Sequence, residues 1–212
     1  MDFIFDPSLA FYLPLHELDG SSFRSHDAYG HLCTVTGALY TAQGRSFDGI
    51  DDSINCGSSD VFDFTSAFTL AAWVKPGALA KNKFIISNRN STEKTGWMLF
   101  HYSDNKFYLQ GGDGVTWGSL SAHTVNTYTD MKVFYFVAGS FDGTGRVFVN
   151  GVADGTDTSD PLAASSYPTL VGNDTHVPTP FEGIIGEVFA FSRALTPQEI
   201  QHIYLATKWR YR

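Results

Sequence analysis

The feature that most constrains the fold is a series of short apolar and aromatic segments, each ended by glycine, proline, asparagine or aspartate. Such segments are typical of β-strands, because branched and aromatic side chains pack well on a pleated surface. The chain has 18 Phe and 10 Tyr in 212 residues, so broad side chains are abundant. We therefore expect an all-β protein. The main predicted strands are residues 68–74, 83–87, 96–102, 106–110, 133–138, 146–149 and 183–191.

The clearest strand pair lies in the second half of the chain. Residues 133–138 are apolar on both faces, as expected of a central strand. Residues 142–145 (DGTG) form a predicted turn into the strand at 146–149. Asn150 and Gly151 follow, and this pair tolerates the positive φ angles of a tight hairpin turn. The pattern predicts consecutive antiparallel strands.

One helix is predicted, close to the end of the chain. Thr196 is a candidate N-cap, Pro197 suits the first helical position, and Glu199 can complete a capping box. Apolar residues then recur at helical spacing, which predicts a short helix docked on the sandwich. The residues expected to face the sandwich are Ile200, Ile203 and Tyr204.

These patterns predict a fold class and a domain organisation. Many strands followed by one helix favour an antiparallel β-sandwich of the jelly-roll type with a short C-terminal helix. A length of 212 residues suits one large sandwich, and 43% hydrophobic residues are enough to form its core. No stretch resembles a linker. We expect residues 1–212 to form a single domain.

Charge and hydropathy exclude two classes of partner. The formal net charge is −8, and lysine and arginine form no cluster. Binding to nucleic acid or to an anionic membrane surface needs a basic patch, so neither partner is expected. No apolar run approaches the roughly 20 residues of a membrane-spanning helix, so membrane insertion is not expected either. Residues 1–6 (MDFIFD) do not have the pattern of a signal peptide.

Several short motifs follow one another in a fixed order between residues 40 and 205. They are FDGIDD at 47–52, FTLAAWVKP at 68–76, FDGT at 141–144, VFVNG at 147–151, LVG at 170–172, FEGIIGEV at 181–188 and SRALTPQEI at 192–200. In order and composition this series resembles the laminin G-like family of concanavalin A-like domains. The resemblance implies two antiparallel sheets, one of them concave, with ligand-binding loops. Members of the family bind glycans, proteins or lipids, accompany enzymes, or occur on phage virions, so the fold alone does not select a function.

Related sandwiches include glycoside hydrolases and polysaccharide lyases, so catalysis needs to be considered. A retaining glycosidase needs two carboxylates about 5–5.5 Å apart, which acids two or four residues apart on one strand face can supply. The E-x-D-x-x-E pattern of glucanases is absent, and Glu17 and Asp19 are predicted to lie in a loop after the first strand. A lyase needs converging polar side chains, but strand periodicity places His101 on the face opposite Tyr102. We predict that the chain is not an enzyme, with a glycan-active hydrolase or lyase as the weaker alternative.

A calcium site is a further candidate. Calcium binds six to eight oxygen ligands, and Asp48, Asp51 and Asp52 gather carboxylates beside Gly49. The alternative is that Asp48 and Asp52 cap turns through hydrogen bonds to the backbone. The family resemblance implies a metal-ligating aspartate in the I-D-E-V motif, where this chain has Gly186. Calcium is therefore compatible with the sequence but lacks one ligand of the family pattern.

Aromatic side chains near polar loop groups are the usual platform for a sugar, and they are also common in a β-sandwich core. The candidate residues lie on neighbouring predicted strands and on the turn between them. The predicted ligand-binding residues are Trp97, Tyr102, Tyr108, Trp117, Asp104 and Asn105, with Asp113 and His123 as hydrogen-bonding neighbours.

The predicted function is a non-catalytic binding module that recognises a carbohydrate or a protein ligand. The alternative is a structural or decoration protein of a virion or cell surface. The expected location is extracellular or on a virion surface, and a homo-oligomer remains open.

Cys33 and Cys56 leave two alternatives. A predicted turn at residues 43–45 could place them on neighbouring strands, either as two buried thiols or as a cross-strand disulfide. No nearby set of cysteines and histidines completes a zinc site.

Overall fold

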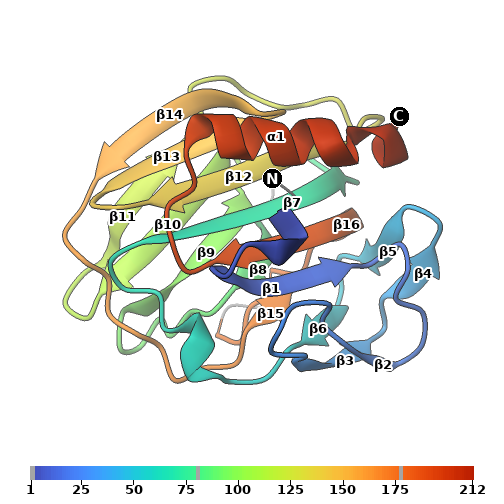
Figure 1. The fold of residues 1–212 in the computed structure, drawn as a ribbon, viewed down its shortest axis with the longest axis horizontal. Coiled ribbons are helices and arrows are strands. Elements are labelled where there is room, and N and C mark those ends of the chain that lie inside the picture. The colour runs from blue at the N-terminus through green and yellow to red at the C-terminus, as the bar shows by residue number, and fades with distance from the viewer. Residues whose placement is uncertain (1–2, 80–81, 177–178) are drawn as a thin grey trace.

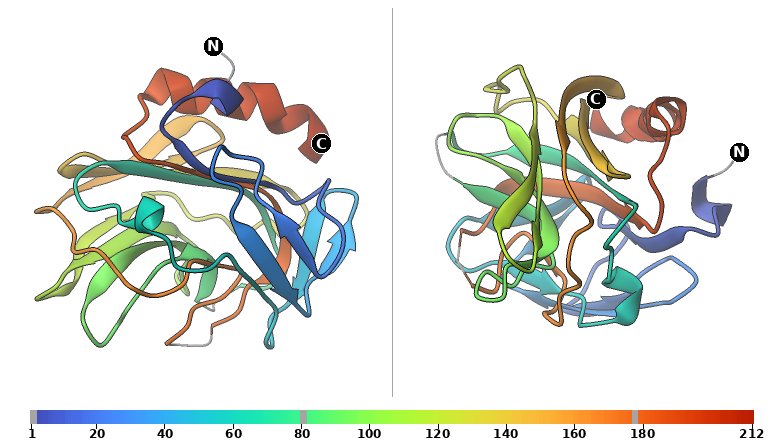
Figure 2. Two further views of the ribbon diagram at one scale, coloured as in Figure 1. Left: turned by 60° about the horizontal axis from the view of Figure 1, so that its bottom comes forward. Right: turned by 90° about the vertical axis from the view of Figure 1, so that its left-hand side faces the viewer.

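The computed structural model describes residues 3–79, 82–176 and 179–212 (Figure 1). Two antiparallel sheets pack face to face, and an α-helix lies on the outer side of one of them (Figure 2). The predicted fold class, an antiparallel β-sandwich with a short C-terminal helix, is confirmed. None of the helices in the described ranges is long and apolar enough to cross a membrane.

The first sheet, sheet A, has eight strands in the order β14–β13–β12–β7–β16–β5–β4, and β1 also pairs with β16. The long strand β16 therefore has β7 on one side, and β5 followed by β1 on the other. Its strands are β1 (Leu9–Pro14), β4 (Leu39–Thr41), β5 (Gly44–Asp48), β7 (Phe68–Pro76), β12 (Tyr135–Phe141), β13 (Thr144–Val149), β14 (Val152–Thr158) and β16 (Glu182–Phe191).

The second sheet, sheet B, also has eight strands, in the order β11–β10–β9–β8–β15–β6–β3–β2. Its strands are β2 (Ser22–Arg24), β3 (Leu32–Thr36), β6 (Ser53–Asn55), β8 (Lys83–Ser87), β9 (Thr95–His101), β10 (Phe107–Asp113), β11 (Trp117–His123) and β15 (Leu170–Val171). The helical elements are the 3-10 turns η1 (Phe3–Phe5), η2 (Asp60–Phe62) and η3 (Lys208–Tyr211) and the α-helix α1 (Pro197–Thr207).

The predicted hairpins in the second half of the chain form as expected. Asn150 and Gly151 join β13 to β14 with φ angles of 52° and 78°. The central strand is displaced from its predicted position, because it begins at Tyr135 and runs to Phe141. Pairing with β7 explains the shift, since Phe141 lies opposite Phe68 and the register extends the strand to that point.

Helix α1 has the predicted cap. Thr196 accepts a hydrogen bond from the backbone N–H of Glu199, and the Glu199 side chain accepts one from the backbone of Thr196. Ile200 and Ile203 are buried against the outer face of sheet A, in an apolar cluster with residues of β1, β7, β12, β13 and β16. Trp73 anchors the end of the helix, because its indole N–H donates to the Thr207 hydroxyl at 2.8 Å.

A buried carboxylate fastens the C-terminal segment to the sheet. Glu187 on β16 is 0% exposed, and its Oε1 atom accepts hydrogen bonds from the Tyr12 hydroxyl and the Arg210 guanidinium, both at 2.9 Å. Burial raises the pKa of Glu187 to about 7, and Arg210 and Tyr12 oppose this shift only in part. The chain end is therefore attached through a group that titrates near neutral pH.

The two outer faces of the sandwich differ. Helix α1, η1 and η3 all lie on the sheet A side, where Phe3 and Tyr211 join the same apolar cluster (Figure 2). The α-helix of the described ranges is on this side, so no α-helix covers the outer face of sheet B. The outer face of sheet B is thus left to the strands and loops in the described ranges.

Candidate functional site

A row of aromatic rings crosses the outer face of sheet B. Phe84 lies opposite Phe100, Phe100 opposite Tyr108, and Tyr108 opposite His123, on the neighbouring strands β8, β9, β10 and β11. The ring centroids are 5.7, 5.2 and 4.8 Å apart along the row. Directly opposed residues point to the same side of a sheet, so the register itself builds the row. We name Phe84, Phe100, Tyr102, Tyr108, Trp117 and His123 the aromatic face.

The aromatic face grades from a covered end to an open end. Phe84 and Phe100 are each 3% exposed and form, with Met98, a small apolar cluster separate from the core between the sheets. Tyr102 is 38% exposed, and His123 on the edge strand is exposed as well. Sequence reasoning placed Tyr102 and His101 on opposite faces, and the structure agrees, since His101 is 0% exposed. The open end therefore offers aromatic surface to a ligand.

Polar groups border the open end. The Tyr108 hydroxyl donates to Asp104 Oδ2 at 2.9 Å. Burial, with this hydrogen bond, raises the pKa of Tyr108 to about 12. On the next row of the sheet, the Gln110 amide donates to the Ser121 hydroxyl at 3.3 Å. Hydroxyl, amide and carboxylate groups thus lie beside the rings, as a sugar-binding surface needs.

Asn105 and Asp113, also predicted near the ligand, shape turns. Asn105 has a φ of 63° in the turn between β9 and β10, where its backbone N–H donates to the Tyr102 carbonyl. Asp113 Oδ1 accepts the backbone N–H groups of Val115 and Thr116, which lower its pKa. We assign both residues a conformational role in the loops beside the aromatic face.

The prediction that Trp97 binds ligand is wrong. Trp97 is 0% exposed and lies between the two sheets, where its indole N–H donates to the Phe62 carbonyl at 3.0 Å. Residues 95–101 form one strand with apolar side chains on both faces, so composition could not show which face holds the tryptophan. The register with β10 places it on the core side.

Besides Phe84 and Phe100, sequence reasoning missed Arg89 in this region. Its guanidinium carbon lies 5.5 Å from the Phe84 ring centroid and 5.0 Å from that of Trp117, which is within cation–π range. Its Nε atom is 3.7 Å from a carboxylate oxygen of Asp174. Arg89 therefore bridges Phe84 and Trp117 and extends the aromatic face toward the start of β11. An isolated arginine after a strand gave no signal for this role.

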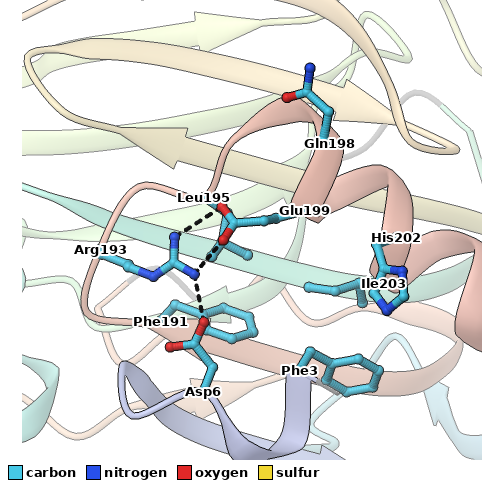
Figure 3. Close-up of a pocket in the computed structure, with 9 residues that line it drawn as sticks. All are labelled: Phe3, Asp6, Phe191, Arg193, Leu195, Gln198, Glu199, His202 and Ile203. Atoms are coloured by element: carbon cyan, nitrogen blue, oxygen red, sulfur yellow. Dashed lines mark hydrogen bonds and ion pairs between the residues drawn. The ribbon is translucent and has the colours of Figure 1, made fainter. Parts of the chain in front are cut away.

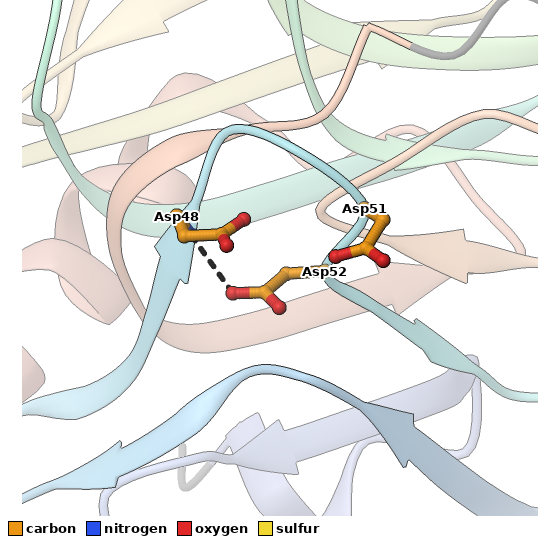
Figure 4. Close-up of side chains that lie close together, drawn as sticks. All are labelled: Asp48, Asp51 and Asp52. Atoms are coloured by element: carbon orange, nitrogen blue, oxygen red, sulfur yellow. Dashed lines mark hydrogen bonds between the residues drawn. The ribbon is translucent and has the colours of Figure 1, made fainter.

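The three aspartates predicted to bind calcium do lie together, in the turn between β5 and β6 (Figure 4). One carboxylate oxygen of each of Asp48, Asp51 and Asp52 lies within 4.8 Å of the others. Asp52 Oδ2 accepts the backbone N–H of Asp48, and Asp48 Oδ1 accepts that of Ile50, both at 2.8 Å. Burial raises the pKa of Asp52, and Asp48 and Asp51 add to the shift. The donor set suits a hard cation, although two of its oxygens already cap the turn.

Gly186 does not belong to this cluster. In the register of β16 with β5, Glu182 lies opposite Asp48, whereas Ile185 lies opposite Arg45. Gly186 is therefore at the other end of β5, where β16 changes partner from β5 to β1. A Cβ atom at position 186 would lie 2.5 Å from the Tyr211 ring, so Tyr211 occupies the place of a side chain there. Position 186 is therefore not next to the acidic turn of Asp48, Asp51 and Asp52, so the glycine there removes no ligand from that turn.

Calcium binding stays a prediction that thermal melting can test. If the acidic turn binds the ion, millimolar calcium will raise the melting temperature relative to EDTA, because a ligand bound to the native state stabilises it. Asp51→Asn should abolish the difference, and it should not disturb the two capping hydrogen bonds, which Asp48 and Asp52 make. Asp130→Asn is a matched control on a distant loop. Identical melting curves in calcium and EDTA would rule the site out.

A hollow lies between η1 and α1 (Figure 3). Its volume is about 190 Å³, and Phe3, Phe191, Leu195 and Ile203 supply its apolar lining. At its mouth the Arg193 guanidinium binds both oxygens of Glu199, at 2.6 and 2.9 Å, and Asp6 Oδ2 at 2.5 Å. These charged groups satisfy one another. Through Arg193, the segment after η1 is therefore connected to the start of α1 beside the hollow.

Glu17 and Asp19, the closely spaced acids considered for hydrolysis, lie after β1 as predicted. Glu17 is exposed and lies 3.2 Å from His16 Nε2, and Asp19 accepts the backbone N–H of Gly20. Both carboxylates thus have local partners in a surface turn.

The two packed antiparallel sheets allow comparison with known sandwich proteins. Residues 48–201 match the family described as the concanavalin A-like lectin/glucanases superfamily, laminin G type. The chain belongs to this family, as its motifs predicted. No curated protein matches the sequence.

Several solved structures share the fold. Domain 4 of AbnA, an extracellular GH43 arabinanase from Geobacillus stearothermophilus in complex with arabinotriose, has a TM-score of 0.72 and 20% identity, covering 93% of this chain and 98% of that domain. The binding domain of botulinum neurotoxin serotype G has a TM-score of 0.72 and 17% identity, covering 93% and 51%. A Trypanosoma rangeli sialidase in complex with sialic acid has a TM-score of 0.71 and 17% identity, covering 98% of this chain and only 34% of the sialidase. At these identities the likeness shows the fold.

Proposed function

We propose that this chain is a non-catalytic binding module that recognises a carbohydrate on the aromatic face of sheet B. The observation that carries the proposal is the row of rings on neighbouring strands, open at Tyr102 and His123 and bordered by Asp104 and Gln110. Aromatic rings can pack against the apolar faces of a sugar, while adjacent polar groups bind its hydroxyls. The outer face of sheet A, by contrast, is occupied by α1.

The similar structures support carbohydrate binding. Domain 4 of AbnA has nearly the same extent as this chain and was solved with an arabinose trisaccharide. The toxin neighbours are also binding domains, and we keep a protein as the second class of ligand. We propose that the module acts outside the cell or on a virion surface, where such ligands are displayed.

A glycan array followed by titration of the best ligand tests the proposal. Tyr102→Ala should weaken binding by about tenfold or more, because Tyr102 is 38% exposed at the open end of the aromatic face and aromatic residues of a binding surface commonly contribute over 1 kcal/mol. Tyr40→Ala is the matched control, since this tyrosine is 43% exposed and lies in β4 of sheet A. Circular dichroism should show that both variants are folded.

Three other results would direct the assignment elsewhere. Equal loss of binding in both tyrosine variants would contradict a site on sheet B. A blank array, together with a symmetric oligomer by light scattering, would favour the structural or decoration role. Release of reducing sugar from a bound glycan would show catalysis.

A further inference from the structure

Cys33 and Cys56 face each other across two paired strands. In the register of β3 with β6, Thr36 lies opposite Ser53 and Thr34 opposite Asn55, so the next position pairs Cys33 with Cys56. Residues directly opposed in an antiparallel pair have Cα atoms about 4.5 or 5.5 Å apart. Both values fall within the roughly 4.4–6.8 Å range of disulfides.

The two side chains also point the same way. Cys33 and Cys56 are 0% and 3% exposed, and both belong to the apolar core between the sheets. Burial raises the pKa of the Cys56 thiol, and a hydrogen bond with the Cys33 thiol adds to the shift. No disulfide joins them in the structure. Opposed positions on paired strands and burial in the same core therefore place the two thiols side by side.

We propose that Cys33 and Cys56 are a reversible oxidation site, at which a small-molecule disulfide such as oxidised glutathione produces a cross-strand disulfide. One cysteine thiolate attacks the glutathione disulfide, forming a mixed disulfide and releasing one reduced glutathione. The other cysteine thiolate then attacks the protein sulfur of that mixed disulfide and releases the second glutathione. The two cysteines lose two electrons and two protons, and the two glutathione molecules gain them.

The edge of sheet B gives the oxidant a route. Strand β3 lies between β6 and the edge strand β2. Strand β2 has only three residues and is largely exposed. Local opening of this short edge strand needs less free energy than unfolding of the sandwich. The thiolate is the reacting form, so the reaction should be slow at neutral pH and faster as pH rises.

The bridge would close a loop that contains β4, β5 and the acidic turn at Asp48, Asp51 and Asp52. Because the bridge links β3 covalently to the end of β6, it restricts the unfolded chain. We expect the oxidised protein to melt roughly 5 °C or more above the reduced protein. Dithiothreitol should reverse the change.

The experiment uses the folded, reduced chain at pH 8 with oxidised glutathione. The expected product has lost two hydrogens by intact mass, has no titratable thiol under denaturing conditions, and yields one peptide pair linked through Cys33 and Cys56. Cys33→Ala and Cys56→Ala should each retain a single thiol that can form only a glutathione adduct.

The wild-type protein alone decides the outcome, so the proposal remains testable even if a variant does not fold. Two free thiols after equilibration, or glutathione adducts without an internal bridge, would overturn it. A bridge that forms only in urea would overturn it as well, because the native register would then not be its cause. None of these results depends on carbohydrate binding.

Discussion

Ile203→Ala is expected to lower the free energy of unfolding by about 2–5 kcal/mol, the usual range for truncating a buried isoleucine to alanine. Ile203 is 2% exposed and packs between α1 and the outer face of sheet A. The truncation leaves a cavity there that the rigid sheet cannot close. Urea unfolding followed by tryptophan fluorescence measures the change.

Thr196→Ala is the comparison for this prediction. It removes the capping hydrogen bond at the start of α1 and should cost about 1 kcal/mol, because the cap is exposed and water can replace it. Neither variant should change ligand affinity at sheet B. If deletion of residues 196–212 left stability unchanged, α1 would not be part of the packed fold.

Glu187→Gln is expected to remove a pH dependence of stability. The pKa of Glu187 rises from 4.5 to about 7 on folding, so the native state holds a proton that the unfolded chain has lost in this interval. Protonation of Glu187 therefore contributes to the free energy of unfolding. This contribution is fully present below about pH 4.5 and is lost as pH rises through 7, which lowers the free energy of unfolding by about 3 kcal/mol. Glutamine stays neutral at every pH. The free energy of unfolding of Glu187→Gln, relative to that of wild type, should therefore increase between about pH 4.5 and pH 7. Unfolding free energies at several pH values test this.

The comparison of the two proteins at each pH is needed because His16 titrates nearby. Burial, followed by the charge of Arg210, lowers the pKa of His16, so its own contribution favours folding as pH rises. Glu93→Gln, which changes an exposed carboxylate, is the matched control and should follow the wild-type curve. Parallel curves for wild type and Glu187→Gln would contradict the prediction.

Features set by neighbouring residues could be predicted from the sequence. The capping box of Thr196 and Glu199 and the turn at Asn150 and Gly151 depend on a few consecutive residues, and both formed as expected. Strand β12 was displaced because its extent depends on Phe68, far away in the chain. Local patterns thus predicted which elements exist, while pairing decided where they begin and end.

The candidate site was only partly predictable for the same reason. Tyr102, Tyr108 and Asp104 are close in sequence, so a hairpin brings them together. The position of Trp97 in the core depends on the Phe62 carbonyl, and the role of Arg89 depends on two rings from different strands. The pairing of Cys33 with Cys56 likewise appears only when the register is known.

The position of η1 and η3 on the sheet A side has a practical and biological consequence. Phe3 and Tyr211 both pack on that side, so a tether joined to either end of the chain approaches from behind the aromatic face. Copies fixed to a chip, a particle or a larger assembly would all present the same surface outward. A polymer with repeating units could then engage several copies at once, and the resulting avidity would exceed the affinity of a single site. Weak binding by the isolated chain would therefore be compatible with firm attachment by an array.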